Sequence, residues 1–88
     1  MRIKNGFVLR NVCGENIVVA EGEENIDFTK IISMNESSAY LWKNVEGKDF
    51  TTEDLCRLLT SEYDVTEDIA QKDAENIANE WTKAGIVE

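Results

Sequence analysis

Residues 33–55, SMNESSAYLWKNVEGKDFTTEDL, mark the point at which the chain changes from a strand pattern to a helical pattern. After Asn35 the apolar residues recur about every 3.6 positions instead of every second position. Asn35 is a good N-cap, because its side-chain oxygen can accept hydrogen bonds from the free amides of a first helical turn. Gly47 suits the end of that helix, and Thr51 caps the next one with Asp54 at the capping-box position. The stretch therefore predicts two capped helices in succession.

The residues before this stretch have the pattern of β-strands. Two runs, 6–12 and 16–20, are rich in β-branched and aromatic residues, and the turn between them contains Gly14. A third run, 28–34, mixes polar and apolar residues, so we expect this strand to be less enclosed than the second one. The helical runs lie at about 36–46, 52–62 and 67–84. The sequence therefore predicts one α+β domain, residues 1–88, of three antiparallel strands followed by three α-helices.

The composition limits the classes of function. The 88 residues suffice for one modest core but not for the deep enclosed pocket that many enzymes need. Nine basic and eighteen acidic residues give a net charge of −9, which repels the phosphate backbone of nucleic acids. The chain has no apolar run of about 18 residues and no apolar core of a signal peptide near its N-terminus. We therefore expect a cytoplasmic accessory domain that binds neither nucleic acid nor membrane.

The sequence offers little for catalysis. It has no histidine, which removes the commonest general base and the commonest nitrogen ligand of metals. Cys13 and Cys56 belong to no CxxC motif, so we interpret them as small buried or half-buried apolar groups in a reducing compartment. The acidic cluster within 21–27 lacks the spacing of a calcium loop. We therefore expect no catalytic residue, no metal site and no cofactor.

The third helical run carries a stripe of small residues. Its inward positions are Ala70, Ala74, Ile77, Ala78, Trp81 and Ala84. This stripe has two interpretations, namely tight packing against the rest of the fold or one wall of a groove beside strand 28–34. Trp42 and Trp81 are typical of a core, although a tryptophan at a core margin can anchor a peptide. Five of the seven charged residues of this run are acidic, whereas the recognition helix of a DNA-binding winged helix is basic.

A small sheet also has edges. If 28–34 is an edge strand, its unpaired N–H and C=O groups can accept a peptide as an added strand. The mixed strand and the helical stripe would then form the two walls of a peptide groove. The same unpaired edge could equally join a second copy of the chain.

Three segments of the sequence resemble the PqqD-like proteins, the peptide chaperones of pyrroloquinoline quinone synthesis. They are MNESSAYLW (34–42), VEGKDFTTEDL (45–55) and YDVTEDIAQKDAENIANEWTKAGIVE (63–88). The likeness lies in the order and spacing of these segments and in the glycine followed by apolar residues that closes the last one. Met34 stands where the family usually has leucine, and Glu46 stands where it has aspartate before the glycine. The resemblance implies a winged-helix-like domain that serves as a recognition element for ribosomally made, post-translationally modified peptides (RiPPs).

The resemblance also implies a partner and a binding site. The leader of a precursor peptide would bind as a strand beside 28–34, in a cleft closed by the third helix, and would be delivered to a modifying enzyme, often a radical SAM protein. Carried over by position, the peptide-binding residues are Thr29, Lys30, Ile31, Ile32 and Ser33 on the strand and Asp73, Ala74, Ile77, Ala78 and Trp81 on the helix. Lys30 could pair with an acidic leader residue, whereas the negative surface favours a neutral or basic one. The alternative function is a small protein-interaction or regulatory subunit without a peptide substrate.

Overall fold

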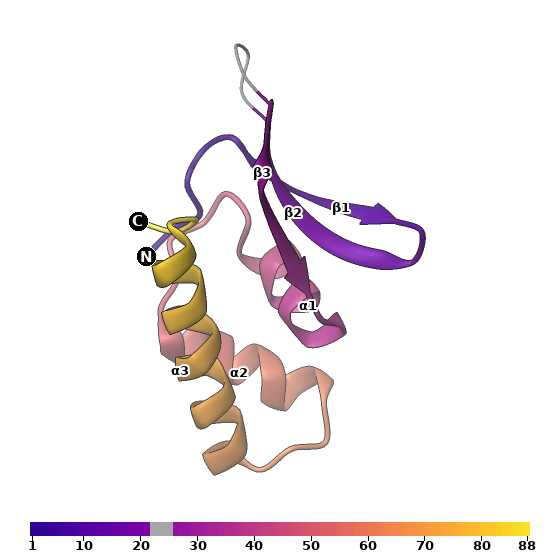
Figure 1. Ribbon diagram of the computed structural model, residues 1–88. Helices are drawn as coiled ribbons and strands as arrows, with labels where there is room; N and C mark the ends of the chain where they lie inside the picture. The colour runs from indigo at the N-terminus through magenta and orange to yellow at the C-terminus, as the bar shows by residue number, and fades with distance from the viewer. Residues whose placement is uncertain (22–25) are drawn as a thin grey trace.

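The computed structural model describes the backbone of residues 1–21 and 26–88 and the side chains of residues 1–20 and 31–88. Its elements are the strands β1 (Phe7–Val12), β2 (Glu15–Glu21) and β3 (Ile26–Met34), followed by the helices α1 (Glu36–Val45), α2 (Thr52–Glu62) and α3 (Glu67–Ala84) (Figure 1). The strands form one antiparallel sheet in the order β1-β2-β3, so that β1 and β3 are the edge strands of the described sheet. The predicted fold of three antiparallel strands followed by three helices is confirmed.

A two-residue turn, Cys13–Gly14, joins β1 to β2. Its φ angles are 53° and 82°, the positive values that a type I′ hairpin turn requires at both central positions. This turn lies at the tip of the hairpin, away from the core, and Cys13 is accordingly exposed, whereas Cys56 is buried. The prediction of a buried or half-buried cysteine is therefore correct for Cys56 and wrong for Cys13.

β3 is longer than its sequence pattern indicates. It begins at Ile26, two residues before the expected start, and pairs with β2 as far as Met34, with a register shift between Val18 and Ala20. At its C-terminal end the side chains alternate as expected: Met34 is buried, while Ile31 is exposed. The acidic cluster within 21–27 lies outside the described side chains.

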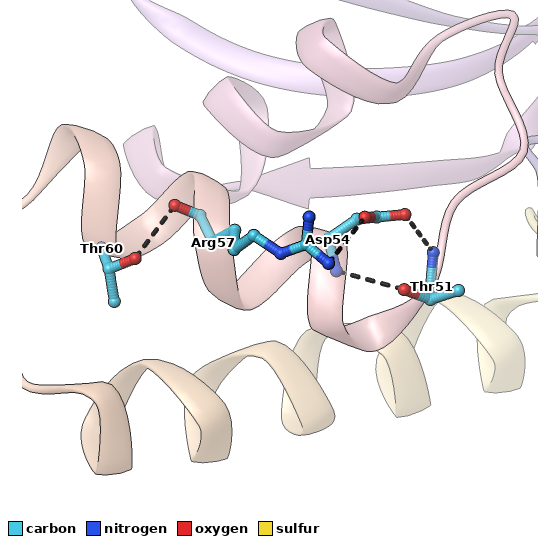
Figure 2. Close-up of polar contacts among 4 residues, drawn as sticks. All are labelled: Thr51, Asp54, Arg57 and Thr60. Carbon is cyan, nitrogen blue, oxygen red and sulfur yellow. Dashed lines mark hydrogen bonds and ion pairs between the residues drawn. The ribbon is translucent and has the colours of Figure 1, made fainter.

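Each helix begins at a cap that the sequence indicates. The Asn35 side chain accepts a hydrogen bond from the Ser38 amide at 2.8 Å at the start of α1. At α2 the Thr51 hydroxyl accepts from the Asp54 amide at 3.2 Å, and the Asp54 carboxylate accepts from the Thr51 amide at 3.0 Å, which completes the capping box (Figure 2). At α3 the Thr66 hydroxyl accepts a hydrogen bond from the Ile69 amide at 3.4 Å, without a capping box. These caps satisfy amide groups that would otherwise lack partners at the helix starts.

The two ends of the described chain pair with each other. After α3 the chain turns at Gly85, whose φ of 74° is left-handed. Ile3 and Val87 form an antiparallel bridge, and the backbones of Arg2 and Glu88 exchange hydrogen bonds of 2.9 and 2.8 Å. This pairing fixes the C-terminal end of α3 and is not indicated by the sequence pattern.

The core lies between the sheet and the helices. α1 packs against the sheet, and α2 packs against α3 (Figure 1). Trp81 is in edge contact with Trp42 and Phe50, with ring centroids 5.4 and 6.1 Å apart. The fully buried Trp42 donates its indole N–H to Glu46 at 2.7 Å, so its one polar group has a partner. The expectation that both tryptophans belong to the core is confirmed.

Candidate functional site

The free edge of β3 is the first component of the candidate site. β2 pairs with one side of β3, and no other described strand pairs with it. Of the residues predicted on this strand, Ile31 is 49% exposed, Ile32 is partly buried against the core and Ser33 is exposed. The backbones of Thr29 and Lys30 belong to β3, while their side chains lie outside the description. The strand can therefore present outward N–H and C=O groups to an added strand.

Three cavities meet where β3 passes into α1. Their volumes are about 670 Å³ at the end of the sheet, 370 Å³ toward the α2–α3 connection and 230 Å³ along α3. Asn35 lines all three, and the second and third also share Ser37 and Asp73. We call the second and third cavities together the junction groove. It connects the residue directly after the edge strand with the surface of α3.

The junction groove draws its lining from three parts of the fold. The β3–α1 junction supplies Asn35, Glu36, Ser37 and Ser38, the α2–α3 region supplies Leu59, Tyr63 and Val65, and α3 supplies Asp73, Asn76, Ile77 and Glu80. One end of the groove is thus apolar, and the other end is polar. Its charged lining residues are all acidic, and no lysine or arginine is among them.

The pKa of Tyr63 reflects the burial and the charges at the apolar end of the groove. Burial of the phenol raises its pKa above 10.0, and the negative charges of Glu36 and Glu62 and the neighbouring Tyr40 raise it further. The rings of Tyr40 and Tyr63 are in edge contact with centroids 5.9 Å apart. The phenol therefore holds its proton to a higher pH than a free tyrosine does, mainly because of its burial.

The residues predicted for the helix wall occupy two different environments. Ala74, Ala78 and Trp81 are buried in the core, with exposed fractions of 0%, 6% and 2%. Ile77, at 9%, belongs to the core and also lines the junction groove. Asp73 is exposed and lines both cavities of the groove. The structure brings Asp73 and Ile77 to the groove and places the other three side chains behind it.

Several groove residues were absent from the predicted site. Asn76 and Glu80 follow Asp73 at helical spacing and could have been found from this periodicity. Asn35 was interpreted only as a helix cap and Ser37 was not singled out, whereas the structure shows that both line the groove. No sequence pattern indicates that the α2–α3 connection reaches the same place.

Among the described side chains, those of residues 1–20 and 31–88, no group of three or more cysteine and acidic residues is placed to hold a metal ion. In the same residues, no helix is both long enough and apolar enough to cross a membrane. Every buried side-chain nitrogen or oxygen in the described part of the chain has a hydrogen-bond partner. The edge of β3 and the junction groove are therefore the features from which we argue function.

Comparisons with known proteins bear on the family and the fold of the chain. Residues 15–87 match the family described as coenzyme PQQ synthesis protein D (PqqD). Among solved structures, the chain is similar to TbiB1 in complex with the TbiA(beta) leader peptide, with a TM-score of 0.73 and 16% sequence identity. This likeness covers 100% of the present chain and 95% of the other. A comparison with curated proteins finds no match.

Proposed function

Since the chain belongs to the PqqD family, we propose that it is a non-catalytic adaptor that binds the leader of a ribosomally synthesised precursor peptide. The observation that carries this proposal is the free edge of β3, which ends beside the junction groove. Further support comes from TbiB1, a protein of similar fold whose structure was solved with a leader peptide.

The proposed mechanism separates alignment from selectivity. Backbone hydrogen bonds along β3 would align the leader as a fourth strand. Each such bond contributes only about 1 kcal/mol net and is nearly independent of sequence. Selectivity would therefore come from leader side chains that enter the junction groove or contact Ile31 on the outward face of the sheet.

We also propose a compartment and a second partner for the protein. We place the adaptor in the cytoplasm, because both cysteines are free thiols, as expected in a reducing compartment. Its second partner would be the enzyme that modifies the peptide, for which a radical SAM protein is our candidate. The net charge of −9 argues against nucleic acid as a partner.

The experiment that tests this function begins with random linear peptides displayed on phage and selected on the immobilised protein. A synthetic peptide of the selected sequence is then titrated into the ¹⁵N-labelled protein. We expect chemical shift changes in the amides of β3 and in those of residues 70–81. Failure to enrich any peptide contradicts the adaptor function. Shifts confined to other surfaces would instead favour the alternative, a subunit that holds a larger partner.

Proline variants test strand addition directly. Along a strand, successive amides point to opposite sides, so one of Ile31 and Ile32 directs its N–H to the free edge. Ile31→Pro and Ile32→Pro are compared with Leu9→Pro and Arg10→Pro on the opposite edge strand, β1. In each pair, the proline that replaces the outward N–H should leave the sheet intact, so this variant should fold. We expect the folded β3 variant to lose peptide binding and the folded β1 variant to keep it. Unchanged affinity in a folded β3 variant that lacks the outward N–H contradicts strand addition.

A further inference from the structure

We infer that the peptide segment in the junction groove carries a basic residue next to an apolar one, and that Asp73 and Glu80 select the basic residue. The inference rests on the proposed function and specifies the chemistry of its peptide. The net charge of the chain alone leaves this open, because only charges beside the bound segment act strongly on it.

The two acids are positioned for this role by the helix itself. Asp73, Ile77 and Glu80 are spaced by four and three residues, so they form one row on α3. Both acidic side chains are exposed, and within the described residues neither forms an ion pair or a hydrogen bond through its carboxylate. Both therefore retain their bonding capacity for a cationic ligand group.

The preference for an apolar peptide residue comes from the apolar end of the groove. Leu59 is buried, and Tyr63 and Val65 are half-buried, so this end can take an apolar side chain from the peptide. Asp73 lines both cavities and stands between the two ends. A peptide that fills the apolar end therefore brings its neighbouring residue close to Asp73, and a lysine or arginine there would be complementary.

The junction groove differs from some other cavities on the described surface in the charge of its lining residues. One cavity elsewhere is lined by Arg2 and Lys4 together with Glu46. Another is lined by Lys48 and Arg57, here accompanied by aspartates. In the junction groove no such basic residue offsets the acids. The adjoining cavity at the end of the sheet is likewise lined by acids, Glu15 and Glu36, and by no basic residue. Charge complementarity thus favours a cationic peptide on this side of the molecule over the two cavities that contain basic residues.

The test uses the same phage-displayed random peptides, selected in parallel on three proteins. The first is the unchanged chain, and the second is the double variant Asp73→Lys and Glu80→Lys. The third is the control Glu75→Lys, which changes an exposed acid roughly 200° around α3 from Asp73. Lysine is a good helix former, so all three proteins should fold, which circular dichroism verifies.

We expect lysine and arginine to be enriched in peptides selected on the unchanged chain and on the control, and to be replaced by acidic residues on the double variant. A synthetic peptide of the first selection should bind the double variant about tenfold more weakly, and its affinity for the unchanged chain should fall as salt is added. Peptides that bind along β3 without any basic preference, or with the same preference on the double variant, overturn this inference and leave the adaptor function intact. If no peptide is enriched on any of the three proteins, the adaptor function itself fails.

Discussion

Two adjacent rows of α3 differ sharply in environment. The inner row consists of Ala70, Ala74, Ala78 and Trp81, all at most 6% exposed. The groove row consists of Asp73, Asn76, Ile77 and Glu80, of which all but Ile77 are exposed. The two rows lie on neighbouring stripes of a single helix. The small residues on this helix therefore serve close packing, whereas the polar row beside them is exposed and free for the proposed recognition.

The physical reason lies in what each row contacts. Alanine side chains allow α2 to approach α3 closely, and Trp81 then fills the wider space near Trp42 and Phe50. Substitutions in the inner row should therefore change stability first, and substitutions in the groove row should change binding first.

Trp81→Ala should have the largest effect. Removal of a buried tryptophan leaves a cavity and eliminates the ring contacts with Trp42 and Phe50, so we expect a loss of about 3–5 kcal/mol in the free energy of unfolding. Urea denaturation followed by circular dichroism measures this loss. Glu80→Ala, one residue earlier on the exposed side, is the control and should stay within about 0.5 kcal/mol. Equal effects of the two substitutions would contradict the distinction between the rows.

Ala74→Leu should have the next largest effect. Ala74 is fully buried, so the added atoms overpack the α2–α3 contact and should lower the free energy of unfolding by about 1–3 kcal/mol. Asn76→Leu, on the groove row, should leave stability within about 0.5 kcal/mol and weaken binding of a selected peptide. A stable Ala74→Leu protein that has lost peptide binding would mean that Ala74 belongs to the groove wall after all.

Much of the fold could be predicted from the sequence because its signals are local. Asn35, Thr51 and Thr66 cap helices through side chains that act within three residues, and Gly85 ends the last helix through its own φ. The pairing of Ile3 with Val87 joins opposite ends of the described chain, and no local pattern specifies such a partner. The local signals thus identified the elements but not the contacts between distant segments.

The candidate site was less predictable for the same reason. The alanine stripe was compatible with a core or a groove, because periodicity identifies a helix face without identifying what covers it. The structure places Ala74 and Ala78 in the core and brings Tyr63 to the groove from another part of the chain. Whether the residues of β3 and α3 contact a peptide stays a prediction.

Ile77→Val should have a smaller effect, because Ile77 lies in the groove row and also belongs to the hydrophobic core. Loss of one buried methylene group should cost about 0.5–1.5 kcal/mol of unfolding free energy. The same change enlarges the groove where a peptide side chain would rest, so affinity for a selected peptide should also change. Parallel urea denaturation and calorimetric titration measure the two effects. A change in stability with unaltered peptide affinity would mean that Ile77 serves the core alone.

The smallest effect concerns the charge of the groove and appears only at alkaline pH. The pKa of Tyr63 is raised above 10.0, so the folded state holds the phenolic proton more tightly than the unfolded state does. The corresponding stability is fully present below pH 10 and is lost as the pH rises through the folded pKa. The unchanged chain should therefore lose more stability above pH 10 than Tyr63→Phe does, as measured by urea denaturation across this range.

Neutralising Glu36 measures how much its charge contributes, beside burial, to the raised pKa of Tyr63. Burial is the larger cause and persists in Glu36→Gln, so the pKa of Tyr63 should fall but stay above 10.0, as followed through the ring resonances of each tyrosine by NMR. Glu75→Gln, on the far side of α3, should leave it unchanged. If Glu36→Gln has no effect either, the charge of Glu36 does not contribute to the raised pKa of Tyr63 and is too weak at the apolar end of the groove to act on a cationic peptide there. The selection of a basic residue would then depend on Asp73 and Glu80 without help from Glu36.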